Sequence, residues 1–515
     1  MTGAEAIVRT LAAGGVNTCF ANPGTSEIHL VAAMDRVQAV RCVPTLFEGV
    51  VTGAADGYAR MAGKPACTLL HLAPGLANSL ANLHNASRAQ VPIVSLVGQH
   101  AASHTRLKSP LVADIESLAR PYSKWLRTPQ TPPEAGLYAA EAVTASRSLP
   151  AGVATLIVPA DVAWGDGGSV AAVRPLPKAA LPSAPTVEQA AQKLRSGLRT
   201  GIILADNGLI GEGLISAGRI AAGTGAMLLA PYPFKRIERG AGRPVVDRIP
   251  YVHEQSARLL AQFRQLLLVG AERPVSYFAH PGRPGSPVPE ECDVFVLAAP
   301  SEDCAGALGM LVDALSLRQV APATEKPQRP PVPGGAEMTL AGLADAVAAL
   351  LPEGAIVADE SMTSGRAMMA AARGAPPHDW LGNTGGSIGI GLPMAAGAAI
   401  ASPGRRVVCL TADGSAMYTI QALWTIAREA LDVTTVVFSN REYAVLSREY
   451  LAYGCGDPGP VASSLFSLSG PELDFAFLAK SMGVTACRAR TLGEFSGALG
   501  AAFESRGPQL IEAVL

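Results

Sequence analysis

Short apolar runs alternate with helical patterns along most of the chain, and they fall into three blocks. Each run has about the length of one strand and is almost continuously apolar, as is typical of strands buried in a parallel sheet. The runs lie at 66–72, 91–98 and 152–159 in the first block, at 200–206, 226–230, 265–270 and 294–298 in the second, and at 355–359, 406–410, 433–438 and 508–514 in the third. This alternation predicts an α/β protein with three doubly wound parallel-sheet domains.

Two proline-rich passages separate the three blocks. RPLPKAALPSAP occupies 174–185, and PATEKPQRPPVPGG occupies 322–335. Because proline lacks a backbone N–H and fixes φ, neither passage can continue a helix or a central strand. A chain of 515 residues is also too long for a single core. We therefore expect domains at 1–173, 186–321 and 336–515.

The composition is that of a soluble globular protein. Lys and Arg total 41 against 42 Asp and Glu, and no basic block is evident, which argues against nucleic-acid binding. No apolar run approaches the ~18 residues of a membrane span, and the N-terminus lacks the apolar core of a signal peptide. The eight cysteines form no CxxC pair and are interpreted as buried reduced thiols. These features predict a cytoplasmic protein without nucleic-acid or membrane partners.

Two neighbouring runs of the third block are followed by polar residues. Asp413 follows the run at 406–410, and Asn440 follows the run at 433–438, with a helical pattern between them. In such a βαβ unit, ligands bind outside the carboxyl ends of the strands. Asp413, Asn440 and the backbone carbonyl of Glu442 are hard oxygen donors, which suit Mg²⁺ or Ca²⁺. Taken alone, an Asp-Gly-Ser stretch after a strand is more commonly a turn and a helix cap.

This segment resembles the diphosphate-binding motif of thiamine diphosphate enzymes, in which a metal ion joins the protein to the cofactor. The resemblance implies cofactor contacts from Asp413, Gly414, Ser415 and Asn440, with Mg²⁺ held by Asp413, Asn440 and Glu442. A helix opening at about Ser415 would direct its free N–H groups at the diphosphate. The family usually has glycine where this chain has Ala412, and often asparagine where it has Ser439. Both departures leave the metal ligands in place.

The first block carries further features of the same family. NPGTSE at 22–27 and LFEGVVTGAADGYAR at 46–60 resemble its N-terminal loop and its glutamate-bearing helix. The resemblance makes Glu48 the acid that hydrogen-bonds the aminopyrimidine ring and promotes loss of the thiazolium C2 proton. It also assigns Asn78 as a cofactor contact. Without the resemblance, a glutamate at a helix start is usually a capping or solvated residue.

The glycine-rich stretch GNTGGSIGIGLP at 382–393 matches the family's strand–helix turn beside the cofactor. Through the resemblance, Gly386 offers a carbonyl to the amino group of the pyrimidine, and Ile388 is the apolar support beneath the cofactor. The central block has no GxGxxG pattern after its first run, and ILADNGLIGEG at 203–213 is its nearest approach. FAD, which some relatives hold there, is therefore not expected.

Histidines bring the chain closest to the benzoylformate decarboxylase-like members of the family. His71 and His280 take the places of active-site histidines, and imidazole transfers protons near neutral pH, although a lone histidine at a strand end is more often structural. The hydroxyl of Thr25 matches a serine and could hold a substrate carboxylate. Glu449 replaces an aromatic residue and Met362 a hydroxyl, so a 2-oxo acid with a polar or basic tail is expected rather than benzoylformate. The remaining histidines are assigned to structure or surface: His29, His84, His100, His104, His253 and His378.

The resemblance implies a thiamine diphosphate- and Mg²⁺-dependent enzyme that decarboxylates a 2-oxo acid non-oxidatively to an aldehyde and CO₂. An acetolactate synthase-like carboligase is the alternative, and the changes at Ala412 and Ser439 keep a catalytically silent binding homologue open. The family also implies a homodimer with shared active sites, with two dimers pairing into a homotetramer. The small-residue segment GVVTGAADGYA at 49–59 would permit close helix packing across the subunit interface.

Overall fold

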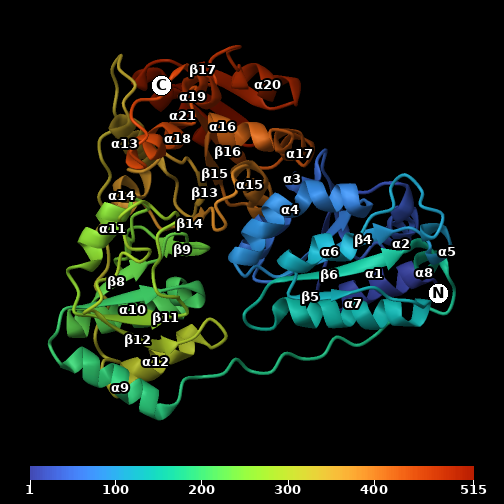
Figure 1. Ribbon diagram of the computed structural model, residues 1–515. Coiled ribbons are helices and arrows are strands. Elements are labelled where there is room, and N and C mark those ends of the chain that lie inside the picture. The colour runs from blue at the N-terminus through green and yellow to red at the C-terminus, as the bar shows by residue number, and fades with distance from the viewer.

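The computed structural model describes residues 1–515 and contains three sheets with helices packed around them (Figure 1). Every predicted apolar run forms a strand, and the predicted class of three parallel-sheet α/β domains is confirmed. The passages at 174–185 and 322–335 contain no sheet strand, and only the last residues of the first enter a helix. The first of them carries the chain from the first domain to the central one (Figure 1). The domain boundaries themselves stay predictions.

The first domain has a six-stranded parallel sheet in the order β2-β1-β3-β4-β6-β5. Its strands are β1 (Thr18–Asn22), β2 (Arg41–Pro44), β3 (Ala66–Leu70), β4 (Ile93–Gln99), β5 (Trp125–Arg127) and β6 (Val153–Pro159). Its helices are α1 (Gly3–Ala13), α2 (Ile28–Val37), α3 (Glu48–Ala62), α4 (Leu72–Arg88), α5 (Ala102–Thr105), α6 (Ile115–Ala119), α7 (Pro132–Arg147) and α8 (Ala160–Trp164). The sheet interior is apolar, because strands β3, β4 and β6 are buried almost along their whole length.

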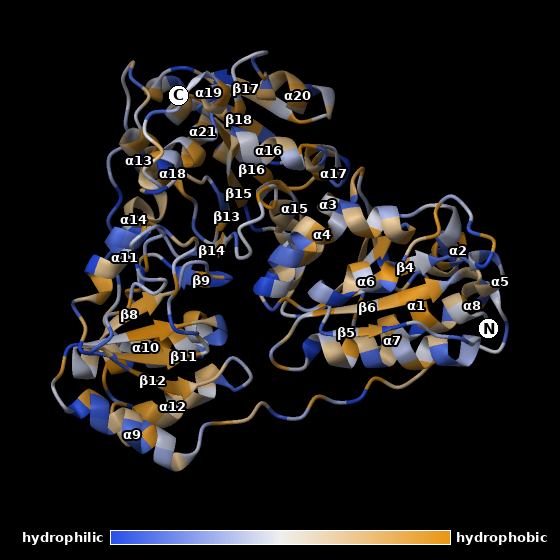
Figure 2. Cartoon of the chain, viewed as in Figure 1, coloured by the Kyte–Doolittle hydropathy of each residue, from blue (hydrophilic) through white to orange (hydrophobic).

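The central domain has a five-stranded parallel sheet in the order β10-β8-β7-β11-β12. Its strands are β7 (Thr200–Leu204), β8 (Met227–Ala230), β10 (Asp247–Arg248), β11 (Gln265–Val269) and β12 (Asp293–Ala298). Its helices are α9 (Ala184–Arg195), α10 (Gly211–Thr224), α11 (His253–Leu260) and α12 (Cys304–Ala314). Figure 2 shows apolar strands inside this domain and hydrophilic residues along α9 and α11.

The third domain has a seven-stranded sheet in the order β17-β18-β16-β15-β13-β14-β9. Its strands are β13 (Ile356–Glu360), β14 (His378–Gly382), β15 (Val407–Ala412), β16 (Val433–Ser439), β17 (Thr485–Ala489), β18 (Gln509–Val514) and β9 (Arg236–Arg239). Its helices are α13 (Leu340–Leu350), α14 (Met368–Ala371), α15 (Gly391–Ala401), α16 (Asp413–Tyr418), α17 (Ala422–Arg428), α18 (Ala444–Ala452), α19 (Pro460–Phe466), α20 (Phe475–Ser481) and α21 (Leu492–Glu504).

Strand β9 joins the central segment to the third domain. It lies between β8 and β10 in the sequence, yet it pairs antiparallel with β14 and so closes one edge of the third sheet. Arg236 on β9 also donates from Nε to Asp379 Oδ1 on β14 at 2.7 Å. A core of 49 buried residues runs through both domains, which fixes the central domain against the third.

The first and third domains are joined by the packing of α3 against α15. A Cβ added at Gly57 would overlap the carbonyl oxygen of Met394, and one added at Gly397 would overlap that of Ala54. Glycine is therefore required for the two helices to approach this closely. The prediction that the small-residue helix at 49–59 packs across a subunit interface is wrong in this respect, since it packs within its own chain.

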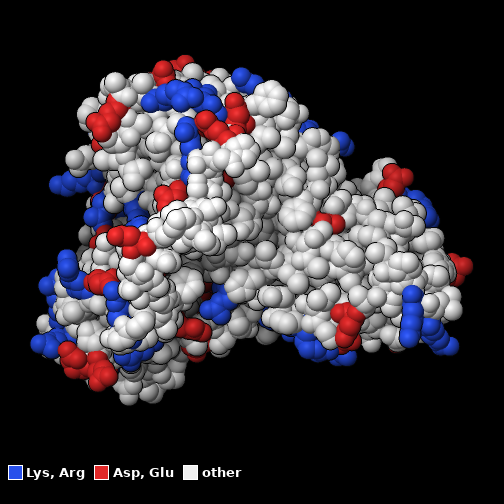
Figure 3. All heavy atoms as spheres, turned by 45° about the horizontal axis from the view of Figure 1, so that its top comes forward, with Lys and Arg blue, Asp and Glu red and all other residues white.

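The surface shows no strong charge asymmetry on the face drawn in Figure 3, where Lys and Arg lie among Asp and Glu in small groups. None of the helices is both long and apolar enough to cross a lipid bilayer. All eight cysteines are free. The prediction that they are buried is wrong for Cys42, Cys455 and Cys487, which are exposed.

Candidate active site

Glu48 opens helix α3, where its side chain is 9% exposed. Its Oε2 accepts a hydrogen bond from Nδ2 of Asn78 at 3.0 Å. Gly75 in α4 leaves the space beside this carboxylate open, since a Cβ there would lie 3.4 Å from Glu48 Oε1 and 3.3 Å from His71 Cβ. Three of the predicted residues, Glu48, Asn78 and His71, therefore lie together at one end of the first domain.

His71 follows strand β3 and is held by a buried acid. Glu27 Oε2 lies 2.7 Å from Nδ1 of His71 and accepts the backbone N–H of Gly24 at 2.8 Å. Because the carboxylate takes the Nδ1–H, the other ring nitrogen, Nε2, is left as the proton acceptor. The next residue, Leu72, has a φ of +50°, an uncommon backbone for a non-glycine residue and one that is found at functional sites.

Glu27 itself was not predicted, although it lies two residues after the predicted Thr25. Its side chain is fully buried, and its Oε1 has no hydrogen-bond partner. A Cβ at Gly98, at the end of β4, would overlap that oxygen. The local signal was an acid three residues into a helix start, where Glu27 accepts the backbone N–H of Gly24, but its burial depends on Gly98, far along the chain. Thr25 is exposed beside it.

His100 and His104 lie near His71 and Glu27. The rings of His100 and His104 are 5.4 Å apart between centroids. The pKa of His100 is lowered by burial and then by the neighbouring His104 and His71, while Glu27 raises it. His100 follows β4, which lies beside β3, and this brings it toward His71. Its assignment to structure or surface therefore missed a titratable group of the same region.

Asp413 lies at the carboxyl end of β15, as predicted, and is 2% exposed. Its Oδ1 accepts the N–H of Gly414 at 2.8 Å, and its Oδ2 accepts the N–H of Arg441 at 2.6 Å. Strands β15 and β16 are paired in parallel, which brings the turn after β16 to this carboxylate. In that turn Asn440 Oδ1 accepts the N–H of Glu442 at 3.2 Å. Helix α16 begins at Asp413 rather than near Ser415.

These residues fit a divalent cation and a diphosphate. Burial raises the pKa of Asp413, and both of its hydrogen-bond donors are backbone N–H groups, so a bound cation would offset the cost of burying its charge. The structure has no group of three or more His, Cys, Asp or Glu side chains placed to hold a metal ion. The predicted metal ligands would not form such a group, because they are one carboxylate (Asp413), one side-chain amide (Asn440) and one backbone carbonyl (Glu442). Ala412 has ordinary extended φ and ψ of −78° and 155°, a conformation open to any residue.

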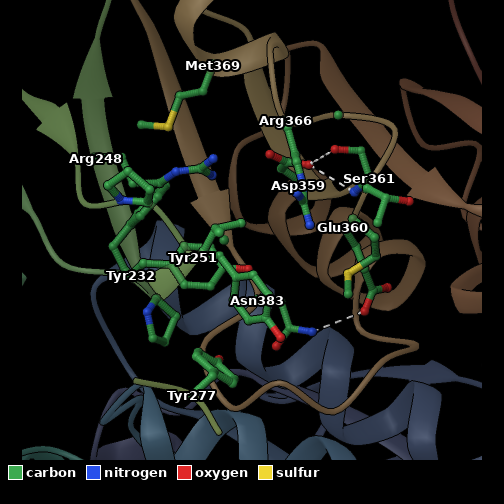
Figure 4. Close-up of a pocket in the computed structure, with 18 of the residues that line it drawn as sticks. Tyr232, Arg248, Tyr251, Tyr277, Asp359, Glu360, Ser361, Arg366, Met369 and Asn383 are labelled. Carbon is green, nitrogen blue, oxygen red and sulfur yellow. Dashed lines mark hydrogen bonds between the residues drawn. The ribbon is translucent and has the colours of Figure 1, made fainter. Parts of the chain in front are cut away.

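The loop with Gly386 and Ile388 is fixed by Glu360, the last residue of β13. Glu360 Oε1 accepts from the N–H of Gly389 at 2.9 Å and from Asn383 Nδ2 at 3.2 Å, and Oε2 accepts from the N–H of Gly391 at 2.7 Å. Figure 4 shows the bond to Asn383. Burial raises the pKa of Glu360 to about 7 against the effect of these donors. Gly386 has a φ of +80°, which favours glycine.

A cavity of about 540 Å³ lies between the central and third domains, beside this loop (Figure 4). Its lining includes the predicted Gly386, Ile388, Met362 and Glu449. Glu449 Oε2 lies 2.9 Å from Nε2 of His280, whose ring lines a smaller neighbouring cavity of about 100 Å³. Met362 has a φ of +49°, a second strained backbone at the site.

One chain does not bring all predicted residues together. The 540 Å³ cavity is lined by residues of the central and third domains, and two sets of predicted residues do not line it: Thr25, Glu48, His71 and Asn78 of the first domain, and Asp413, Gly414, Ser415, Asn440 and Glu442 of the third. Helix α4 of the first domain does reach the loop beside the cavity, where Asn82 and Asn85 donate to the carbonyls of Gly389 and Ser387. Each half is nevertheless locally ordered, with Glu48 and His71 in one group and the cofactor loop with His280 in the other.

Comparisons with known proteins agree with this geometry. Residues 1–118 match the model of the thiamine pyrophosphate enzyme N-terminal TPP binding domain, and residues 363–513 match that of the C-terminal TPP binding domain. The chain is 50% identical, over all of its length and 99% of the relative, to a Mycobacterium tuberculosis protein named "Putative acetolactate synthase large subunit IlvX". It is 30% identical to benzoylformate decarboxylase of Pseudomonas aeruginosa, over 97% of this chain and 96% of that protein.

A solved structure of a thiamine diphosphate-dependent enzyme is also similar to this chain. The thiamine diphosphate-dependent 4-hydroxybenzoylformate decarboxylase of Rhodococcus jostii RHA1 superposes with a TM-score of 0.84 at 25% identity, covering 99% of this chain and 98% of that one. The two matched ranges contain Glu48, Asn78 and His71 in the first domain and Gly386, Ile388, Asp413 and Asn440 in the third, whereas His280 lies between the two ranges. The chain belongs to the thiamine pyrophosphate enzyme family and carries its N- and C-terminal cofactor-binding domains.

Proposed function

We propose that the protein is a thiamine diphosphate- and Mg²⁺-dependent enzyme that decarboxylates a 2-oxo acid non-oxidatively to an aldehyde and CO₂. The observation that carries the proposal is the pair of carboxylate-bound histidines, His71 on Glu27 and His280 on Glu449. A reaction that releases CO₂ and ends in a proton transfer needs such groups near neutral pH. Two decarboxylases of aromatic 2-oxo acids are among the similar proteins named above.

The third domain would hold the cofactor. Asp413, the Asn440 amide oxygen and the Glu442 carbonyl would bind Mg²⁺, and Gly414 and Ser415, in the first turn of α16, would lie beside the diphosphate. When bound, thiamine diphosphate supplies a nucleophilic carbon and an electron sink for the bond to CO₂.

The remaining residues would orient the reactants and move protons. Ile388 would support the cofactor, and the Gly386 carbonyl would accept its amino group. Glu48, whose carboxylate is held by Asn78, would share a proton with the pyrimidine N1′. His71 and His280 transfer protons to and from the substrate, and the Thr25 hydroxyl donates to its carboxylate.

An acetolactate synthase-like carboligase, which joins two 2-oxo acids, is the second candidate. It is supported by the name of the relative at 50% identity. A panel of 2-oxo acids separates the two candidates: CO₂ and aldehyde should appear together, with or without added pyruvate. Acyloin products without aldehyde would instead establish the carboligase.

A catalytically silent homologue would give no saturable near-UV circular dichroism signal when titrated with thiamine diphosphate and Mg²⁺. The assay contains no FAD, because the enzyme is expected not to require it. Activity that appears only when FAD is added would contradict this expectation.

We further propose that the active unit is a dimer with shared sites. Within one chain, Glu48 lies outside the cavity that Ile388 and Gly386 line, so the first domain of one subunit would complete the site on the third domain of its partner. Pairing of two dimers into a tetramer and a cytoplasmic location stay predictions.

Subunit mixing tests this arrangement. Glu48→Gln and Asp413→Ala chains are each expected to be inactive. In a shared-site heterodimer both lesions fall in one site, and the other site is intact. Equal mixing should therefore restore about one quarter of wild-type activity, because half of the dimers are mixed and each has one working site. If native mass spectrometry shows mixed dimers but activity stays absent, each site is built within one chain.

A further inference from the structure

Each acidic side chain that lines the cavity already has a hydrogen-bond donor or a cationic partner within the protein. Asp359 accepts from the N–H of Ser361 at 3.0 Å and from Trp380 Nε1 at 2.9 Å. Glu360 accepts from the loop that it fixes, as described above, and Asp247 pairs with Arg373. Glu449 is bound by His280 and accepts from the Tyr251 hydroxyl at 3.3 Å. The expectation that Glu449 selects a basic substrate tail is therefore weakened, since its oxygens are already in use.

Three arginines that line the same cavity form no ion pair, although Glu325 and Asp247 act on Arg239, and Glu449 on Arg366, against the larger effect of burial on their pKa values. Arg366 and Arg248 are partly buried and form no ion pair and no hydrogen bond, although Arg248 lies 5.3 Å from the ring centre of Tyr232. Arg239 is 8% exposed, and its buried Nε has no partner, while its Nη2 donates to the Met369 carbonyl at 2.6 Å. Burial lowers the pKa of Arg239 to about 9 and, to a smaller extent, that of Arg366.

The surroundings strengthen the field of these arginines. The rings of Tyr232, Tyr251 and Tyr277 form one wall, with centroids 5.4–5.7 Å apart. Aromatic walls exclude water, and a charge beside them is screened less than it would be in solvent. Figure 4 shows Arg248 on the central-domain side of the cavity and Arg366 on the third-domain side, with Tyr232 and Tyr251 closer to Arg248 than Tyr277, which lies lower in the view. A guanidinium group buried without an anion is unfavourable, and an anionic ligand removes that cost.

We propose that Arg239, Arg248 and Arg366, which line the cavity without an ion-pair partner, bind an anionic group on the tail of the substrate. The preferred substrates are then 2-oxo dicarboxylic acids, whose reacting end lies at Ile388 and whose second carboxylate lies at the arginines. This inference rests on the proposed decarboxylation. It replaces the polar or basic tail expected from Glu449 with an acidic one.

The test compares substrates and arginine variants. 2-Oxoglutarate and 2-oxoadipate are assayed against 2-oxohexanoate, which has an uncharged tail, and against 2-oxo-5-guanidinopentanoate, which has a cationic one. Each is measured with wild type, Arg366→Gln, Arg248→Gln and the control Arg258→Gln, an exposed arginine of α11 outside the cavity.

We expect a kcat/KM for the better dicarboxylate at least ~10-fold above that for 2-oxohexanoate, as one charge-assisted hydrogen bond provides. Arg366→Gln and Arg248→Gln should each lower the dicarboxylate value by ~10-fold or more. Turnover of 2-oxohexanoate should change less than ~3-fold, and Arg258→Gln should change neither. Equal use of charged and uncharged tails, or a preference that survives both substitutions, would overturn the proposal.

Binding measurements separate failure of this inference from failure of the proposed function. If no 2-oxo acid releases CO₂, the proposed function is wrong, and calorimetric titration with glutarate then tests the arginines alone. Glutarate binding that Arg366→Gln weakens ~10-fold, with no binding of pentanoate, supports an anion site. No glutarate binding to wild type overturns it. Inorganic phosphate that binds at the arginines without any preference for dicarboxylic substrates identifies a separate anion and overturns the assignment to the substrate tail.

Discussion

Gly98→Ala should disconnect His71 from its acid, Glu27, although neither of these two residues is itself replaced. The added Cβ would overlap Glu27 Oε1 and lie 2.6 Å from Glu27 Cδ, whereas an ordinary contact begins near 3.4 Å. The carboxyl carbon must therefore move by at least 0.8 Å, and Oε1 by more. Hydrogen bonds of 2.7 Å to His71 and 2.8 Å to the N–H of Gly24 would stretch beyond useful length.

The expected loss follows from those two bonds. Each joins a buried carboxylate to a donor, and such a bond contributes roughly 1.5–3 kcal/mol, so breaking both lowers the free energy of unfolding by roughly 3–6 kcal/mol. A domain of this size loses about 2–4 °C of Tm per kcal/mol. With Nδ1 of His71 no longer held, turnover should fall by ~10²-fold, the usual scale for losing a positioned acid–base group.

The assay combines thermal unfolding of the purified protein with decarboxylation kinetics over pH. Gly309→Ala is the matched control, because a Cβ there meets nothing within 4 Å. Gly98→Ala/Glu27→Ala removes the overlap but also lacks both hydrogen bonds of Glu27, so its Tm should stay below that of wild type and its activity should stay low. Wild-type Tm and turnover in Gly98→Ala, or a double variant that regains full activity, would refute the positioning role of Glu27.

Four further outcomes test the remaining assignments. Asp413→Ala should abolish Mg²⁺-dependent cofactor binding in calorimetric titration, because it removes the single carboxylate ligand. Glu48→Gln should still bind cofactor but slow hydrogen exchange at its C2 by ~10²-fold or more, as followed by NMR. His280→Ala should lower kcat by ~10²-fold and alter its pH profile while cofactor affinity stays near wild type. The pKa of Glu360 is raised from its usual 4.5 to about 7, so its contribution to stability is full below pH 4.5 and is lost as pH rises through 7. Relative to Glu360→Gln, the wild-type free energy of unfolding in urea should therefore fall by ~3 kcal/mol across that window, and a constant difference between the two would contradict the raised value.

The sequence predicted those strands whose burial is visible locally. Runs such as 433–438 are buried throughout and mostly apolar, because both faces of the sheet are covered by helices. Strand β9 was missed because its residues, RIER, include three charged side chains and pair with β14, from a different part of the chain. Such an edge strand is stabilised by partners that no local pattern identifies.

The candidate site shows the same division. Asp413 and Asn440 were predicted because a strand and its following turn are contiguous in sequence. Glu27 and Glu360 were not, since each acts through residues far along the chain: Glu27 on His71, and Glu360 on the loop before α15. The small residues of α3 were correctly read as a close-packing surface. Their partner was not, because sequence alone does not say which chain supplies the opposing helix.

Strand order explains why the two groups of site residues arise where they do. In the first sheet, β1 and β3 are neighbours. The connection after β1 leads to β2 on one side, and the connection after β3 leads to β4 on the other; Thr25 follows β1 and His71 follows β3. In the third sheet, β13 and β15 are neighbours. The connection after β13 leads to β14 on one side, and the connection after β15 leads to β16 on the other; Asp413 follows β15. At each of these reversals the two connections leave in opposite directions and open a crevice at the carboxyl ends of the strands. One chain therefore contains two crevices of the same topological origin. In the proposed dimer the crevice of one subunit's first domain faces that of its partner's third domain, which is the contact that subunit mixing tests.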